Sequence, residues 1–340
     1  MKFANVFVPA SEAESVPFVA LPDGRWLRLV DIANELAPSL GNIVGRNFQL
    51  WACTTAQVVH DPRDFLIRTK EWLDAFPSKN LKAHPDRYLI FSDKDIKRQN
   101  AYFLPPVKAP RAFRDFYAFE QHVKTARAKR GLEVPPAWYE APAFYFSNPG
   151  TLIGHDDEVY APRGSVELDY ELELGIIIGQ GGRDIPLEKA WEHVAGFTII
   201  NDFSARDIQR TEMSVGLGPA KGKDFATGVG PYLVTLDDFK DRIDAAGRLT
   251  LEMCARVNGK ELSRGNARTM HFTWPQIIAR ASADAELFPG DLIGSGTVGT
   301  GCILELGPEN TDGWLKPGDV VECEIERLGV LRHWIVNRPN

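Results

Sequence analysis

The sequence predicts a β-rich α+β protein in which a small N-terminal α+β domain, residues 1–104, precedes a larger domain of residues 105–340. Beyond residue 105, short apolar segments recur between glycine- and proline-containing turns, with few helix-like stretches. One of these segments alternates polar and apolar residues with the period of two that a strand requires. The first hundred residues lack this density of short strands and carry hairpin and helix signals instead.

The N-terminal region contains four predicted elements. Residues 18–29 predict a hairpin with Pro-Asp-Gly at its turn, and residues 30–36 and 65–76 predict helices. Residues 104–111 are rich in proline and predict an extended linker into the larger domain. Because no chemistry is evident here, we interpret this region as scaffold or as support for a dimer.

The first strand of interest is the run at residues 166–174, which places an acid at every second position: Glu167, Asp169, Glu171 and Glu173. Alternate side chains share a face in a strand, so we expect all four carboxylates to point the same way. Clustered buried carboxylates repel one another, and the repulsion is relieved by water, by a basic partner or by a bound cation. For an acidic strand in isolation, a solvated face is the ordinary interpretation.

A second apolar run, residues 196–202, ends in Asp202. Ser204 and Asp207 follow it with the spacing of a capping box, which predicts that a helix begins there. Asp202 therefore lies where a strand gives way to a turn, a common place for functional residues.

The connection between the two strands decides whether their acids meet. Residues 185–194 predict one short helix, which is long enough to bring the second strand back beside the first. Asp202 would then lie near Glu171 and Glu173. Three carboxylates from two strands would form an open site for Mg²⁺ or Ca²⁺, with coordination positions left for water and substrate.

Composition excludes several classes of function. The 340 residues are 44% hydrophobic and 25% charged, with a net charge of −7, which is typical of a soluble globular protein and unfavourable for nucleic acid. No apolar run approaches the roughly 20 residues of a membrane span, and no signal peptide is evident. The four cysteines are scattered, which predicts reduced thiols in a cytoplasmic protein.

Residues 294–299 fit the dinucleotide-binding pattern Gly-x-Gly-x-x-Gly. That fingerprint requires a helix after the glycines, whereas residues 302–306 predict a strand, so we reject nucleotide binding on this ground.

Five stretches together resemble the fumarylacetoacetate hydrolase superfamily. They are Tyr-Glu-Leu-Glu-Leu at 170–174, Asn-Asp-Phe-Ser-Ala-Arg-Asp-Ile-Gln at 201–209, Lys-Gly-Lys-Asp-Phe-Ala-Thr-Gly at 221–228, Pro-Gly-Asp-Leu-Ile-Gly-Ser-Gly-Thr at 289–297 and Lys-Pro-Gly-Asp-Val-Val-Glu at 316–322. They occur in the family's order, and the resemblance covers roughly residues 105–340. It implies a mixed β-roll catalytic domain, a homodimer and a divalent metal ion.

The resemblance also implies roles for individual residues. The metal ligands would be Glu171, Glu173 and Asp202, with Asp115 as a fourth. Glu167 and Asp169 would be solvated or paired with a surface lysine or arginine. The catalytic residues would be His122 as general base, Glu305 as its orienting partner, and Lys223, Arg206 and Gln209 as groups that stabilise a developing enolate; a purely structural salt bridge is the alternative for Arg206. The substrate-contacting residues would be Tyr117, Tyr145 and Thr297.

These residues predict a divalent-metal-dependent hydrolase that cleaves a carbon–carbon bond in a 1,3-diketo or acylpyruvate-type acid, in the catabolism of aromatic compounds. The ion would be Mg²⁺, and carboxylate ligands also accept Ca²⁺ or Mn²⁺. The alternatives are an isomerase, hydratase or decarboxylase using the same metal-enolate site, and a non-catalytic member that keeps the metal. The decarboxylase branch places a glutamate three residues after the histidine, where this chain has Thr125.

Overall fold

The computed structural model describes residues 1–7, 16–21, 24–29, 31–32, 69–71, 73–74, 90–91, 102–107 and 110–339. Strands dominate these residues and helices are short, which confirms the predicted β-rich α+β class. The strands are β1 (Lys2–Phe7), β2 (Val16–Ala20), β3 (Trp26–Arg28), β4 (Ile90–Phe91), β5 (Tyr102–Leu104), β6 (Phe113–Phe116), β7 (Phe144–Ser147), β8 (Leu152–Ile153), β9 (Glu158–Val159), β10 (Leu168–Asp169), β11 (Leu172–Ile178), β12 (Val194–Asp202), β13 (Ser204–Ala205), β14 (Thr227–Thr235), β15 (Glu252–Val257), β16 (Lys260–Asn266), β17 (Leu292–Thr297), β18 (Val320–Ile325) and β19 (Gly329–Ile335). Within residues 110–339 the α-helices are α6 (Glu120–Ala128), α7 (Ala137–Glu140), α8 (Arg206–Val215), α9 (Trp274–Ser282) and α10 (Ile303–Leu306).

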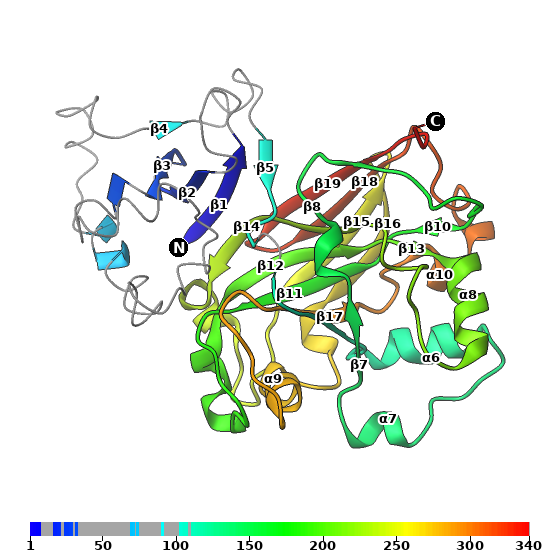
Figure 1. Cartoon of the computed structure of the whole chain (residues 1–340), viewed down its shortest axis with the longest axis horizontal. Helices are drawn as coiled ribbons and strands as arrows, with labels where there is room; N and C mark the ends of the chain where they lie inside the picture. Colours follow the sequence, from blue (N-terminus) through cyan, green and yellow to red (C-terminus); the bar gives the residue numbers. More distant parts are fainter. Residues whose placement is uncertain are drawn as a thin grey trace.

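A large mixed sheet forms the centre of the fold. Its strands follow the order β4-β3-β2-β1-β14-β12-β11-β17-β6-β7, with β5 paired to β1 and β8 paired to β14. The N-terminal strands therefore extend the same sheet, because β1 pairs antiparallel with β14 (Figure 1). The predicted hairpin is present, since β2 and β3 pair antiparallel. Residues 31–32 of the helix predicted at 30–36, and residues 69–71 and 73–74 of the one predicted at 65–76, are helical; the other residues of both predicted helices lie outside the described residues.

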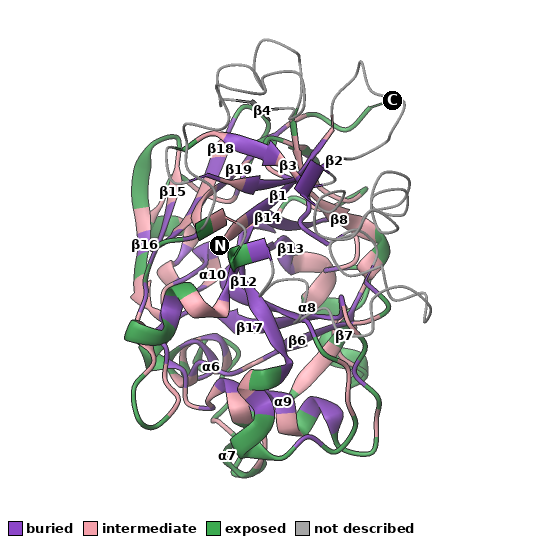
Figure 2. Cartoon of the chain, turned by 90° about the vertical axis from the view of Figure 1, so that its left-hand side faces the viewer, coloured by how far each residue is buried: buried purple, intermediate pink, exposed green. Residues whose placement is uncertain are grey.

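A second sheet, in the order β16-β15-β18-β19-β9, packs against the first, where β18 and β19 contact β12 and β14. Every residue of β11 and β12 is buried, because both faces of these strands are covered. Their residues are apolar or glycine, apart from Glu173 in β11 and Thr198, Asn201 and Asp202 in β12. Figure 2 shows the central strands buried and the exposed residues concentrated on outer helices, loops and β16. Among the described residues, no helix has the length and apolar character needed to cross a membrane.

The acidic run is not a single strand, contrary to prediction. It divides into β10, which pairs with β13, and β11, which pairs with β12 and β17. The chain leaves the strand geometry at Tyr170 and Glu171 because the two halves join different sheets. The four acids consequently do not share one environment.

Two local predictions were wrong. The capping box does not form, because α8 begins at Arg206 after Ala205, the Ser204 hydroxyl donates to the Asp202 carbonyl, and Asp207 accepts from Ser165 and Val166. Residues 303–306 form the helix α10 rather than a strand. This helix is one turn long and follows the glycines by several residues. The helix predicted between β11 and β12 is present as a 3₁₀ helix, Leu187–His193.

Candidate active site

Three carboxylates meet at the centre of the large sheet. Glu173 comes from β11, Asp202 ends the neighbouring β12, and Asp115 comes from β6 on the other side of β17. All three are buried, and one carboxylate oxygen from each lies within 4.8 Å of the others. We call these residues the carboxylate cluster. Sheet pairing therefore brings together acids that are 29 to 87 positions apart in the chain.

The space between two of these acids is provided by Gly294 on β17. A Cβ atom at this position would collide with Asp115 Oδ1 and would lie 3.2 Å from Glu173 Oε2. Those same two oxygens are buried and have no hydrogen-bond partner among the described residues. Burial raises the pKa values of Asp115 and Glu173 well above those of ordinary aspartate and glutamate side chains, and repulsion from the neighbouring carboxylates raises them further.

A divalent cation fits this cluster. Buried carboxylate oxygens without donors are costly, and an ion with a preference for oxygen ligands would remove both the missing contacts and the mutual repulsion. Asp115, which we expected as a fourth ligand, belongs to the cluster, whereas Glu171 does not. The oxygen-only donor set suits Mg²⁺, Mn²⁺ or Ca²⁺ and is poorly matched to softer metals.

Glu171 is instead held by two cations. Arg206 Nη2 donates to its Oε1 at 2.8 Å, and the Lys223 ammonium donates to its Oε2. Burial alone would raise the pKa of Glu171, but Lys223 and Arg206 hold it well below its ordinary value. Lys223 also lies 2.6 Å from Asp202 Oδ2, so the lysine joins Glu171 to the carboxylate cluster. Burial opposes the charge on Lys223, yet Asp202 and Glu171 raise its pKa.

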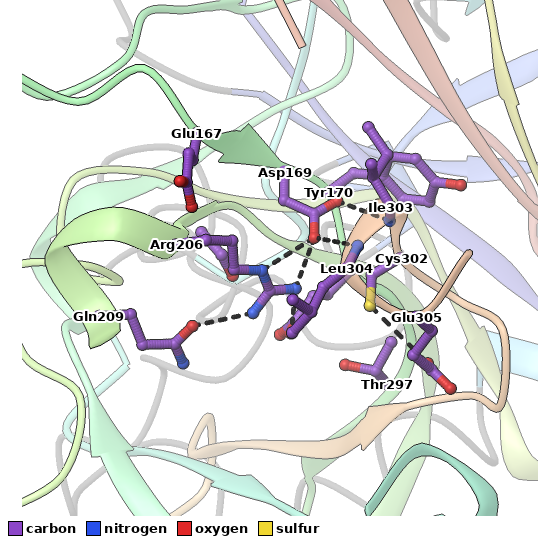
Figure 3. Close-up of polar contacts among 12 residues, drawn as sticks. Glu167, Asp169, Tyr170, Arg206, Gln209, Thr297, Cys302, Ile303, Leu304 and Glu305 are labelled. Atoms are coloured by element: carbon purple, nitrogen blue, oxygen red, sulfur yellow. Dashed lines mark hydrogen bonds and ion pairs between the residues drawn. The ribbon is translucent and has the colours of Figure 1, made fainter. Parts of the chain in front are cut away.

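Arg206 makes a buried hydrogen-bond network with the acids around it. Its Nε lies 2.8 Å from Asp169 Oδ2, and its Nη1 donates to Gln209 at 2.9 Å (Figure 3). Asp169 is fully buried, so the expectation that it is solvated or paired at the surface was wrong. Glu167 does pair with an exposed residue, Arg210. Because each nitrogen of the Arg206 guanidinium has a protein acceptor, the geometry favours the structural alternative for Arg206. Gln209 is one of those acceptors.

Asp169 also reaches the second half of the site. Its two oxygens accept from the backbone N–H groups of Ile303 and Leu304, at 2.8 and 3.0 Å, which are the first residues of α10. These N–H groups have no intrahelical partner at a helix start, so the carboxylate satisfies them. Asp169 thereby fixes the helix that carries Glu305. Its alternation with the other acids is the only sequence signal that it had a role.

The predicted acid–base pair is close in space. His122 on α6 and Glu305 on α10 are both buried, and Nδ1 of the histidine lies 2.6 Å from Oε1 of the glutamate. An ionised carboxylate can only accept, so Nδ1 is the donor in this contact, and in the neutral imidazole Nε2 is then the nitrogen with the lone pair. Glu305 is held by two more donors, the N–H of Thr300 at 3.1 Å and the thiol of Cys302 at 3.7 Å. The contact of Cys302 with Glu305 was not predicted. The two residues are three positions apart, a spacing that brings side chains together in a helical turn but not in the strand that was expected there.

Each of the three expected substrate contacts touches the site. The Tyr145 hydroxyl donates to Asp202 Oδ2 at 2.6 Å, and burial followed by the charge of Asp202 raises its pKa well above the ordinary value. Thr297 donates to Glu173 at 3.3 Å. The Tyr117 ring meets the His122 ring edge to face at 5.3 Å, and burial raises the pKa of Tyr117 to about 12. Tyr145 and Thr297 therefore contact the carboxylate cluster, and Tyr117 contacts the acid–base pair.

The sequence matches a known family over most of its length. The family model described as Fumarylacetoacetate (FAA) hydrolase C-terminal matches residues 111–336. Oxaloacetate tautomerase FAHD2A, mitochondrial, of Homo sapiens is 34% identical over 244 residues, which are 71% of this chain and 71% of that protein. A 2,4-didehydro-3-deoxy-L-rhamnonate hydrolase of Sphingomonas sp. (strain SKA58) is 37% identical over 198 residues, 57% of this chain and 65% of that protein.

A solved structure shows the same fold. Maleylpyruvate hydrolase from Sphingobium sp. SYK-6, in complex with manganese(II) ion and pyruvate, superposes with a TM-score of 0.64 at 21% identity, over 100% of both chains. The three related proteins include a tautomerase and two hydrolases, so the common fold accommodates more than one reaction.

Proposed function

The chain belongs to the fumarylacetoacetate hydrolase family, and we propose that it is a divalent-metal-dependent hydrolase of the carbon–carbon bond in a 2,4-diketo acid of the acylpyruvate type. The observation that carries this proposal is that one buried network connects the His122–Glu305 pair to the carboxylate cluster. Asp169 binds the helix that carries Glu305 and also binds Arg206, and Glu171 joins Arg206 to Lys223, which binds Asp202. Such acids arise when aromatic rings are opened, which is the metabolic setting that we propose.

Asp115, Glu173 and Asp202 would hold the ion, which on binding polarises the keto–enol oxygens of the substrate and stabilises negative charge on them. Lys223 lies against Asp202 and Glu171, so its ammonium is fixed at the edge of the same site. We propose that this ammonium stabilises the negative charge that appears on the leaving enolate. Tyr145, which is bound to Asp202, orients the bound substrate.

The proton path runs through His122. Nε2 accepts a proton from water, and the water oxygen forms a bond to the distal carbonyl carbon. Glu305 stabilises the imidazolium that results and keeps the ring oriented through Nδ1. The carbon–carbon bond then breaks with its electron pair passing to the enolate, and Nε2 returns the proton to the carbon that leaves. Each group ends in its starting protonation state.

A tautomerase is the second candidate, favoured by the 34% identity to oxaloacetate tautomerase FAHD2A over 71% of this chain. It would use the same groups without water. His122 Nε2 would remove the proton from the carbon between the two carbonyl groups, and the enolate oxygen would take up a proton from Lys223 to give the enol. Exchange with bulk solvent would return both side chains to their starting protonation states. No bond to water would form and no fragment would leave.

The proposed function is tested by following the ultraviolet enol absorbance of a panel of acylpyruvates, a fumarylacetoacetate-like diketone and oxaloacetate. Each substrate is incubated with Mg²⁺, with EDTA, and with the Glu173→Gln and His122→Asn variants, and the products are separated by chromatography. We expect two fragments from at least one diketo acid, in a reaction that needs Mg²⁺ and both residues. Rapid enol–keto conversion of oxaloacetate without fragments would overturn the hydrolase in favour of the tautomerase.

A further inference from the structure

A second group of potential metal ligands lies within the site. His122, Cys302 and Glu305 are all buried, and one nitrogen, sulfur or oxygen atom from each lies within 4.8 Å of the others. Cys302 and Glu305 belong to the same turn of chain at the start of α10, and Figure 3 shows the thiol directed at the carboxylate. The proposed reaction uses the histidine and the glutamate but leaves the thiol without a function.

This donor set differs in kind from the carboxylate cluster. Imidazole and thiolate are ligands of choice for Zn²⁺ and related thiophilic ions, whereas Mg²⁺ prefers oxygen alone. The charges also suit a buried divalent ion, because one thiolate and one carboxylate together neutralise it. The carboxylate cluster offers only oxygen donors, so it lacks the nitrogen and sulfur ligands that favour a soft ion.

All three donor atoms lie within 4.8 Å of one another, and two of their separations can be compared with those of a tetrahedral site. Metal–ligand bonds of about 2.0 to 2.3 Å place neighbouring ligand atoms roughly 3.3 to 3.7 Å apart. Cys302 Sγ and Glu305 Oε1 are separated by 3.7 Å. His122 Nδ1 and Glu305 Oε1 are separated by 2.6 Å, so an ion would have to replace their shared proton and widen that gap by under 1 Å.

Hydrogen bonds from Thr300 and to Asp169 hold Cys302 and Glu305 in place. Thr300 binds the other carboxylate oxygen of Glu305, which leaves Oε1 directed at His122 and Cys302. Asp169 binds the first two N–H groups of α10, and so fixes the backbone on which Cys302 and Glu305 lie. The donor set is therefore organised before any ion arrives.

We propose that His122, Cys302 and Glu305 form an inhibitory binding site for a thiophilic divalent cation such as Zn²⁺, separate from the site of the hard catalytic ion. The inhibition, but not the binding, rests on the proposed function. When the ion binds, the thiol proton passes to solvent and the imidazole proton moves from Nδ1 to Nε2. Nε2 then has no lone pair to accept a proton from water.

The binding is tested with Cd²⁺, because a cadmium–thiolate bond has an ultraviolet charge-transfer band that requires no substrate. Magnesium-loaded protein is titrated with Cd²⁺ alongside the Cys302→Ser variant and a control, Cys254→Ser. Cys254 also donates to a carboxylate, that of Glu261 at 3.3 Å, but it lies on β15 of the second sheet. We expect one band per chain that disappears in Cys302→Ser and persists in the control. A band of equal size in Cys302→Ser would overturn the proposal.

Inhibition is tested by adding Zn²⁺ in the turnover assay at saturating Mg²⁺. We expect inhibition at micromolar Zn²⁺ that further Mg²⁺ does not relieve, and at least a tenfold loss of zinc sensitivity in whatever activity Cys302→Ser retains. Relief by Mg²⁺ would show that Zn²⁺ acts at the carboxylate cluster and would overturn the inhibitory role. If no substrate is turned over, the proposed function fails while the cadmium band still decides the binding.

Discussion

The buried acids of the 167–173 run fall into two groups with opposite electrostatic environments. Asp169 and Glu171 are paired, since Arg206 and Lys223 supply charged donors to them. Glu173 is unpaired, because it faces Asp115 and Asp202 and has a buried oxygen with no hydrogen-bond donor among the described residues. Asp169 and Glu173 are four positions apart in the chain, yet one is surrounded by cationic donors and the other by carboxylates.

The difference separates architecture from function. A buried ion pair that is fully hydrogen-bonded stabilises the folded chain once formed, because removal of either partner leaves the other charge unpaired. An unpaired buried carboxylate destabilises the chain unless a cation joins it. The paired acids therefore maintain the shape of the site. The unpaired acid destabilises the folded chain when no cation is bound, and we interpret it as a residue kept for cation binding. Three predictions test this division, and a fourth concerns a buried titratable group outside both groups.

The largest effect is expected at Glu173. Glu173→Gln removes a proposed ion ligand, so we expect Mg²⁺ affinity to fall at least tenfold and activity to fall about a thousandfold, which is about 4 kcal/mol in transition-state free energy. Without Mg²⁺ the same variant should unfold at an equal or higher temperature than the wild type, because a repelling charge is gone. Calorimetric titration and thermal unfolding measure the two effects. Unchanged Mg²⁺ affinity would contradict the assignment.

The second prediction concerns the paired group. Asp169→Asn removes the charge opposite Arg206 and weakens acceptance from the N–H groups of α10. We expect the free energy of unfolding to fall by about 3 kcal/mol, measured by urea denaturation without Mg²⁺. Glu167→Gln, which breaks a pair with the exposed Arg210, is the control and should change stability by less than about 1 kcal/mol. Equal effects of the two substitutions would remove the distinction.

The third prediction asks whether the two groups act independently. Mg²⁺ at about 100 times its dissociation constant should stabilise the wild type by about 2.7 kcal/mol, because it binds only the folded chain. Asp169→Asn should gain a similar amount, since its side chain does not belong to the carboxylate cluster, whereas Glu173→Gln should gain far less. Urea denaturation with and without Mg²⁺ gives the three differences. Loss of the gain in Asp169→Asn would show that the groups are coupled.

The sequence predicted much of this arrangement and missed its division into two groups. The strand period and the strand end brought attention to Glu173 and Asp202, because both signals are local. The partner of Asp169 is Arg206, 37 positions away, and the contact forms only because β10 pairs with β13 and places α8 beside it. Such non-local pairing has no signature in a single sequence, so Asp169 was expected to be solvated or paired with a surface lysine or arginine.

The acid–base pair shows the same limit. His122 and Glu305 were placed in one site by resemblance, and the structure brings them within 2.6 Å across 183 positions. The contact of Cys302 with that pair depended on whether residues 302–306 form a strand or a helix. Their apolar character fits a buried strand, but Asp169 satisfies the N–H groups of Ile303 and Leu304 and allows one helical turn.

The smallest predicted effect concerns His333, a buried histidine that is neutral in the folded chain at neutral pH. His333 on β19 packs against Gly228 and the ring of Phe203, behind the end of β12. Burial, followed by repulsion from His155, lowers the pKa of His333 to about 3. An unfolded histidine titrates near about pH 6.5, so between these values the unfolded chain binds a proton that the folded chain does not.

The stability contributed by neutral His333 is therefore present above about pH 6.5 and is lost as the pH falls toward about 3. We expect His333→Gln to reduce the loss of stability between about pH 7 and pH 5 by about 2 kcal/mol, as measured by urea denaturation at both pH values. Phe203→Leu, which alters packing against the same ring without changing a titrating group, is the control and should lower stability equally at both pH values. If His333→Gln leaves the pH dependence of the unfolding free energy unchanged, the His333 ring binds a proton in the folded chain as readily as in the unfolded chain, which would contradict the prediction.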